Sequence, residues 1–94
     1  MFISSNIEES AELLKLLGDT TRLKILNLLF SEERDMCVNE IAHEVGASQS
    51  ATSHQLSKLE ALNIVCCFRD GQKVCYELTN KPIVGLIKKI LKVV

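Results

Sequence analysis

The sequence is poor in the residue types and patterns from which enzyme sites are built. It has no tryptophan, one proline and four glycines, and only 4% of its residues are aromatic. It contains no Gly-rich phosphate loop, no Ser-His-Asp pattern and no pair of carboxylates suited to a catalytic pocket, and 94 residues leave little room for a cleft. We therefore expect a protein that is not an enzyme and that needs no cofactor.

Long apolar runs are absent as well. No stretch approaches the roughly 18 to 20 apolar residues that are needed to cross a bilayer. The N-terminus lacks the positive region followed by an apolar segment that is typical of a secretory signal. No repeat and no linker rich in Pro, Gly or Ser divides the chain. The sequence thus predicts one globular domain over residues 1–94, no membrane partner and a cytoplasmic location.

Charge of either sign is nearly balanced overall, but it is unevenly distributed. The net charge is −1, yet residues 1–47 hold four Lys or Arg against nine Asp or Glu, whereas residues 48–94 hold seven against three. The two halves therefore carry −5 and +4. A local positive surface in the second half would suffice for phosphate contacts, with salt-sensitive binding and little indiscriminate affinity for nucleic acid.

The segment from Asn39 to Val65 predicts a helix with two opposed faces. Gly46-Ala47 ends a short amphipathic helix, and a second helix starts near Ser48. One of its faces should turn to a core and carries Thr52, Leu56, Leu59, and Leu62 or Asn63. The other face, with Gln49 at its start, is small and polar and carries Ser50, Ser53, His54 and Ser57. Such a face can sink into a DNA groove, so we predict the recognition helix of a helix-turn-helix.

Strand-like residues follow this helix in two runs, 64–68 and 74–78. Asp70-Gly71 between them is a strong hairpin signal because glycine tolerates the positive φ of tight turns. A hairpin directly after a recognition helix is a wing, and Arg69 and Lys73 would lie at its tip, within reach of phosphates or the minor groove. The alternative is that these basic residues only keep a sheet edge soluble.

Both ends of the chain predict helices with more apolar surface than one small domain needs. After Pro82, which is favourable in a first helical turn, apolar residues recur at helical spacing at Ile83, Leu86, Ile87, Ile90, Leu91 and Val94. Near the N-terminus one stripe holds Ile7, Ala11 and Leu14, and a second holds Leu13, Leu16 and Leu17. One stripe can pack on its own domain and the other on a second copy, which favours a homodimer over terminal helices that only close the monomer core.

Three segments together resemble the ArsR/SmtB family of winged-helix repressors. They are LLGDTTRLKILNLL from Leu16 to Leu29, MCVNEIAHEVGASQSATSHQLSKLEALNIV, and RDGQKVCYELTN from Arg69 to Asn80. The resemblance covers about residues 9–92 and implies a dimer in which three helices precede a recognition helix, a wing and a last helix. It implies that effector binding releases DNA. It also places Ser48, Gln49, Ser50, Ser53 and His54 on the DNA side, and Arg69 and Lys73 on the wing.

The four cysteines do not complete either ligand set of the metal-sensing branches of that family. One branch has a Cys-Val-Cys pair where this chain reads Cys37-Val38-Asn39, and another uses an Asp and His pair where this chain reads Asn80-Lys81-Pro82. We therefore expect no metal site. We also expect replacement of all four cysteines to leave DNA affinity within a few fold.

A thiol sensor remains an alternative, with Cys37, Cys66 and Cys75 as weak candidates. If Asp70-Gly71 forms the hairpin loop, Cys66 falls opposite Cys75, and the two thiols could approach each other beneath the wing. The simpler interpretation is that these residues are small buried apolar side chains in strands.

The sequence thus predicts a mainly α protein with a small β-hairpin, a winged helix-turn-helix with dimerisation helices at both ends. The expected function is that of a dimeric, sequence-specific DNA-binding transcriptional regulator that represses from a palindromic operator and is released by an unidentified effector. The alternative is a winged-helix module that binds protein within a transcription complex, because the fold does not fix the partner. Arg69 and Lys73 on the wing favour DNA.

Overall fold

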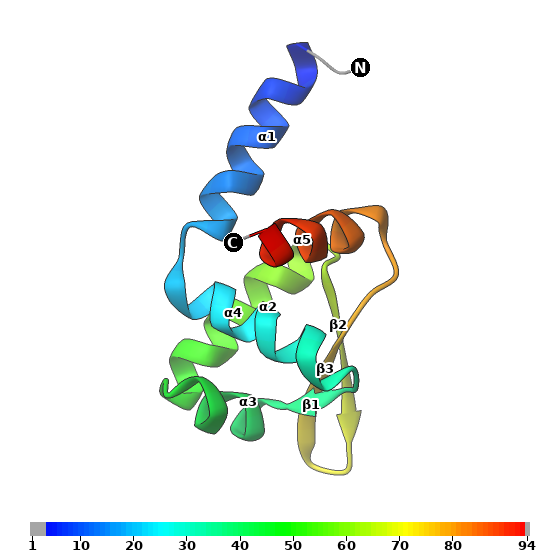
Figure 1. Cartoon of the computed structure of the whole chain (residues 1–94). Helices are drawn as coiled ribbons and strands as arrows, with labels where there is room; N and C mark the ends of the chain where they lie inside the picture. The colour runs from blue at the N-terminus through cyan, green and yellow to red at the C-terminus, as the bar shows by residue number, and fades with distance from the viewer. Residues whose placement is uncertain (1–3, 94) are drawn as a thin grey trace.

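The computed structural model describes residues 4–93, and the described part contains five helices and three strands (Figure 1). In chain order they are α1 (Ser4–Leu17), α2 (Thr20–Glu32), β1 (Met36–Cys37), α3 (Val38–Val45), α4 (Gln49–Ala61), β2 (Val65–Asp70), β3 (Lys73–Leu78) and α5 (Pro82–Val93). The expected mainly α fold with a small hairpin is confirmed. Among the described residues, no helix combines the length and apolar character that a membrane span requires.

Short local signals set the ends of the helices around the predicted turn. The Asp19 side chain accepts a hydrogen bond from the backbone N–H of Arg22 at 2.9 Å and caps α2. Gly46 ends α3 with a φ of +73°, a left-handed conformation that glycine adopts without strain. The Ser48 hydroxyl then caps α4 by accepting from the N–H of Ala51 at 3.1 Å. The helix, turn and helix therefore follow the sequence pattern closely.

The sheet is antiparallel, with β3 in the centre between β1 and β2. Asp70 pairs with Lys73, so the two loop residues are Gly71 and Gln72, and Gly71 has a φ of +67°. The expected Asp70-Gly71 loop is wrong by one position, because glycine takes the first place in the loop rather than the second. As a result Phe68, not Cys66, lies opposite Cys75.

The core lies between the helices and one face of this sheet. Its fully buried side chains come from α2, α3, α4, the turn before β2, the sheet and α5, and include Ile25, Leu26, Leu29, Met36, Ile41, Leu56, Leu59, Ile64, Val65 and Ile87. Burying each large aliphatic side chain contributes about 1.5 to 3 kcal/mol. This core fixes α4 and the hairpin on one rigid body.

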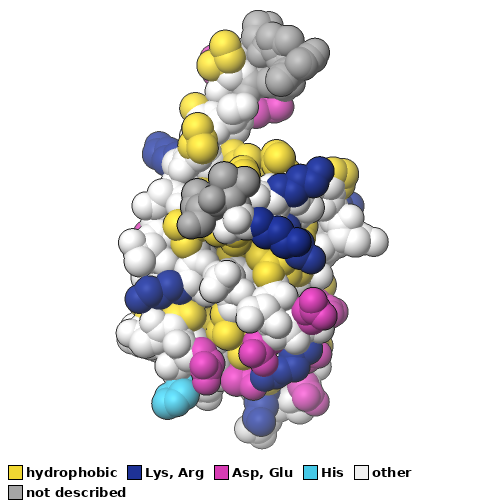
Figure 2. All heavy atoms as spheres, viewed as in Figure 1, with side chains coloured by type: hydrophobic (Ala, Val, Ile, Leu, Met, Phe, Trp, Pro, Cys, Tyr) yellow, Lys and Arg dark blue, Asp and Glu magenta, His cyan; other side chains and the backbone are white. Residues whose placement is uncertain are grey.

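Helix α1 packs on that body only near its C-terminal end and projects away from it (Figure 1). Leu16 and Leu17 are buried, whereas Ile7 is 70% and Leu14 is 65% exposed. Figure 2 shows hydrophobic side chains along the projecting helix and at its junction with the body. The prediction of two apolar sides on this helix is confirmed, and the side that carries Ile7 and Leu14 has no cover within the described chain.

One buried cation joins α1, α2 and α4. Arg22 is only 9% exposed, and its side-chain Nη1 donates a hydrogen bond to the carbonyl oxygen of Leu16 at 2.7 Å. Its Nε donates to Oε1 of Gln55 on α4 at 2.9 Å. The bond to Leu16 satisfies a carbonyl in the last turn of α1, where the helix dipole also favours a positive charge.

We expect Arg22→Leu to lower the free energy of unfolding by about 2 to 4 kcal/mol, because the Leu16 carbonyl and the Gln55 amide lose a charged donor. Urea unfolding followed by circular dichroism measures the change. Lys24→Leu, on an exposed position of the same helix, is the matched control and should change stability by less than about 0.5 kcal/mol. Equal stabilities of the two variants would contradict the assigned role.

Candidate nucleic-acid interface

Helix α4 has one buried and one open side, as its sequence pattern predicts. Thr52, Leu56 and Leu59 are fully buried. The polar side chains predicted to face DNA lie on the open side: Ser48, Gln49, Ser50, His54 and Ser57 are exposed and Ser53 is half-buried. Leu62 and Asn63 depart from the expectation, because Leu62 is 51% exposed and Asn63, with a φ of +62°, forms the turn into β2.

The open side of α4 borders the hairpin. Burial raises the pKa of Tyr76 on β3, and the neighbouring thiol of Cys67 and carboxylate of Glu60 on α4 raise it further. The Ser57 hydroxyl acts on the same phenol in the opposite direction. Helix α4 packs against β2, which pairs with β3, and this packing positions the hairpin beside the polar helix.

The hairpin tip carries the two predicted basic residues. Arg69 and Lys73 are exposed at the turn end of β2 and β3. Acidic residues lie nearby, since Asp70 is the Cα partner of Lys73 in the ladder and Lys73 helps to lower the pKa of Glu40 on α3. The wing therefore presents a modest positive tip rather than a strongly basic one.

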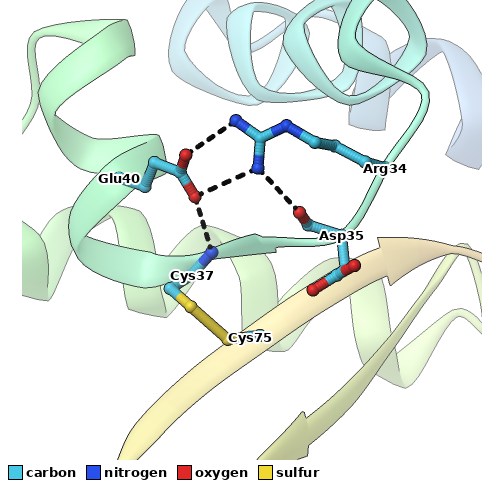
Figure 3. The surroundings of a disulfide bond; sticks show 5 residues. All are labelled: Arg34, Asp35, Cys37, Glu40 and Cys75. Atoms are coloured by element: carbon cyan, nitrogen blue, oxygen red, sulfur yellow. Dashed lines mark hydrogen bonds and ion pairs between the residues drawn. A yellow bond between two sulfur atoms is a disulfide. The ribbon is translucent and has the colours of Figure 1, made fainter. Parts of the chain in front are cut away.

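A polar cluster next to the hairpin braces the start of α3 (Figure 3). Arg34 Nη2 lies 2.7 Å from Glu40 Oε2, and Glu40 Oε1 accepts from the backbone N–H of Cys37 at 3.3 Å. The hydrogen bond from Arg34 is the largest cause that lowers the pKa of Glu40. Because both side chains are substantially exposed, the pair contributes orientation more than stability.

The cysteines are arranged differently from the expectation. Cys37 in β1 lies directly opposite Cys75 in β3, and the two form a disulfide. Cys66 and Cys67 are free and exposed, and Cys66 faces Glu77 across the ladder. The hypothesis that Cys66 and Cys75 approach each other is therefore wrong, because it depended on the misplaced loop. Within residues 4–93 no cluster of three or more His, Cys, Asp or Glu side chains could hold a metal ion.

Two connections escaped the sequence reasoning. The pairing of Cys37 with Cys75 depends on β1, a strand of two residues that no period-2 pattern can reveal. The contact between Arg22 and Gln55 joins residues 33 apart in sequence. One indication of the contact between Arg22 and Gln55 was present in the sequence: Arg22 lies in the segment from Leu16 to Leu29 that resembles a known family.

Together, the polar helix α4 and the adjoining hairpin, packed with α2, α3 and α5 around one core, define a winged helix-turn-helix protein. The sequence model of one protein family, described as bacterial regulatory protein, arsR family, matches residues 19–67 of this chain. The chain belongs to this ArsR family, which is a family of regulators rather than enzymes.

Individual relatives agree with this assignment. The chain is similar to the cadmium resistance transcriptional regulatory protein CadC of Listeria innocua, with 39% identity over 79% of this chain and 61% of the relative. It resembles the structure of NolR from Sinorhizobium fredii at 36% identity and a TM-score of 0.74, covering 97% of this chain and 92% of the other. It also resembles the homodimeric winged helix-turn-helix DNA-binding domain of Mb0332 from Mycobacterium bovis at 25% identity and a TM-score of 0.77, covering 95% and 81%. The chain spans about three fifths of the length of CadC.

Proposed function

We propose that this protein is a homodimeric, sequence-specific DNA-binding repressor whose helix α4 enters the major groove. The observation that carries the proposal is the open polar side of α4 beside a hairpin with a basic tip. The DNA-binding description of the Mb0332 domain, which has the same fold, supports it.

The residue types on α4 suit direct readout. The major groove is about 12 Å wide and admits one helix, and short side chains allow the helix backbone to approach closely. Gln49 and His54 can donate to or accept from base edges, and the hydroxyls of Ser50, Ser53 and Ser57 can bond to phosphates or bases. Ser48 acts differently, because its hydroxyl caps α4. The cap fixes the first turn of the helix, whose free backbone N–H groups can bind a DNA phosphate.

A second copy of the chain would cover the exposed apolar surfaces of the terminal helices α1 and α5. An open groove of about 1110 Å³ runs beside α1 and is lined in part by Leu13, Leu16, Leu62 and Ile83. Leu86 of α5 is 49% exposed. A two-fold dimer through these helices would present two copies of α4 to half-sites about 10 to 10.5 base pairs apart, which implies a palindromic operator.

Release by an effector is part of the proposal. CadC is described as a cadmium resistance regulator, yet at the position of the Cys-Val-Cys pair this chain has Cys37-Val38-Asn39. We therefore propose no resident metal.

Selection from a random duplex library tests the proposal. Purified protein should enrich one palindromic sequence, and fluorescence anisotropy should give a Kd at least about a thousandfold tighter for it than for a scrambled duplex. Failure to enrich any duplex would contradict the DNA-binding function and favour a module that binds protein.

The wing should contribute affinity without sequence preference. Arg69→Ala and Lys73→Ala should each weaken binding to the selected and the scrambled duplex by similar factors, and each should reduce the slope of log K against log salt by about 1. Anisotropy titrations over a salt series measure both. Gln72→Ala in the same turn is the uncharged control and should leave the slope unchanged. A loss confined to the selected duplex would show that the wing reads bases instead.

A further inference from the structure

We propose that Cys37 and Cys75 are a site of reversible thiol oxidation that reacts with hydroperoxides, and that the disulfide raises DNA affinity by fixing the wing against the helix-turn-helix. The inference rests on the proposed function, because its readout is DNA binding. It concerns a pair of thiols that joins the strand before α3 to the central strand of the hairpin (Figure 3).

The two residues are partners in the sheet as well as being bonded through sulfur. They are Cα partners in the antiparallel β1–β3 ladder, 3.8 Å apart, and the adjacent pair Met36 and Tyr76 is almost completely buried. Opposed side chains in such a ladder project to the same face. The reduced thiols are therefore neighbours whenever this part of the sheet is formed.

The two cysteines have unequal access, as an attacking and a resolving thiol require. Cys37 is partly exposed, whereas Cys75 is fully buried. Cys37 is also the N-cap residue of α3, where the helix dipole favours a thiolate. The nearby Glu40 carboxylate would oppose that charge, but Arg34 pairs with it at 2.7 Å. Cys37 is thus the attacking thiol and Cys75 the resolving one.

The chemistry is a two-electron oxidation with a hydroperoxide as the oxidant. The Cys37 thiolate attacks one peroxide oxygen, the O–O bond breaks, and the leaving oxygen takes a proton to form water or an alcohol. The Cys75 thiol loses its proton and attacks the resulting sulfenic acid. The S–S bond forms, the S–O bond breaks, and water leaves. A low-molecular-weight thiol reverses the reaction by exchange and is itself oxidised to a disulfide.

Breaking the disulfide must loosen the wing. Since β1 has only two residues, few ladder hydrogen bonds hold β3 on this side once the covalent link is gone. The wing of the disulfide form is pre-organised beside α4, and pre-organisation lowers the entropy that binding must remove.

The chain contains its own control pair. Cys66 and Cys67 are exposed and free, but they are consecutive in β2, so their side chains alternate between the two faces of the strand. They offer equivalent thiols without a cross-strand partner thiol. Oxidation that depends on mere exposure would act on them first.

The experiment compares pre-reduced full-length protein before and after stoichiometric hydrogen peroxide. Mass spectrometry of tryptic peptides should find the Cys37–Cys75 disulfide, and anisotropy on the selected duplex should find binding about fivefold tighter after oxidation. Cys37→Ser, which keeps a good N-cap residue, and Cys75→Ala should bind like reduced protein in both conditions. Cys66→Ser/Cys67→Ser should respond like the wild type.

Three results would overturn the inference: no Cys37–Cys75 disulfide, unchanged or weaker binding after oxidation, or a response that persists in Cys37→Ser. Hydrogen exchange of the β3 amides, which should slow on oxidation, is measured without DNA. A protein that forms the disulfide and slows this exchange but binds no duplex in either state would refute the proposed DNA-binding function instead.

Discussion

Replacement of Ser53 and His54 together by Glu should weaken binding to the selected duplex by about 100-fold or more. Both positions lie on the open side of α4, where His54 is exposed and Ser53 half-buried. Two carboxylates there would press against phosphates and the acceptor-rich groove, and like charges juxtaposed across an interface cost several kcal/mol. Anisotropy at moderate salt measures the loss, and circular dichroism and sedimentation should show an unchanged fold and oligomer.

A matched variant separates position from charge. Asn27→Glu/Ser31→Glu adds the same two charges on exposed positions of α2, one helical turn apart, and we expect it to retain affinity within a few fold. If the α4 variant kept wild-type affinity, or if both variants lost it equally, α4 would not be the helix that enters the groove.

Dimer formation should depend equally strongly on the exposed apolar residues of the terminal helices. We expect Leu14→Asp and Leu86→Asp each to weaken self-association by about 100-fold or more, because an interface would bury an unpaired carboxylate. Both side chains are about half exposed or more in the single chain, so each monomer should stay folded. Sedimentation velocity at micromolar concentration measures the shift, and DNA affinity should fall with it.

Lys89→Asp introduces the same side chain at an exposed polar position of α5 and should remain dimeric. A wild type that sediments as a monomer at these concentrations would refute the arrangement. Variants that stay dimeric would show that another surface forms the interface.

The sequence predicted those parts of the fold that local chemistry determines. Gly46 and Ser48 are a helix stop and a helix cap by virtue of their own backbone freedom and hydroxyl group, so the turn before α4 was predictable. The alternation of buried and open positions along α4 follows from helical periodicity alone. Its last turn did not, because Asn63 leaves the helix in a left-handed conformation and carries Leu62 into the open.

What could not be predicted depends on contacts between distant segments. A one-position error in the hairpin loop moved every cross-strand partner, which is why the cysteine pair was misassigned. β1 has no pattern of its own and exists because β3 offers a free edge to two residues. Likewise, the chemistry of Arg22 was visible in the sequence, but its acceptor on α4 was not.

The projecting helix has a consequence for the lifetime of the protein in the cell. Residues 7–12 of α1 are all exposed, and so short a helical segment is unstable in water without packing. In an unassembled copy this segment should fray and become a substrate for proteases, whereas in a pair it should be covered. Copies present below the concentration at which they associate would then be degraded first. The protein would thus persist only at concentrations above the dissociation constant of the pair. No separate degradation signal would be needed to remove the unpaired copies.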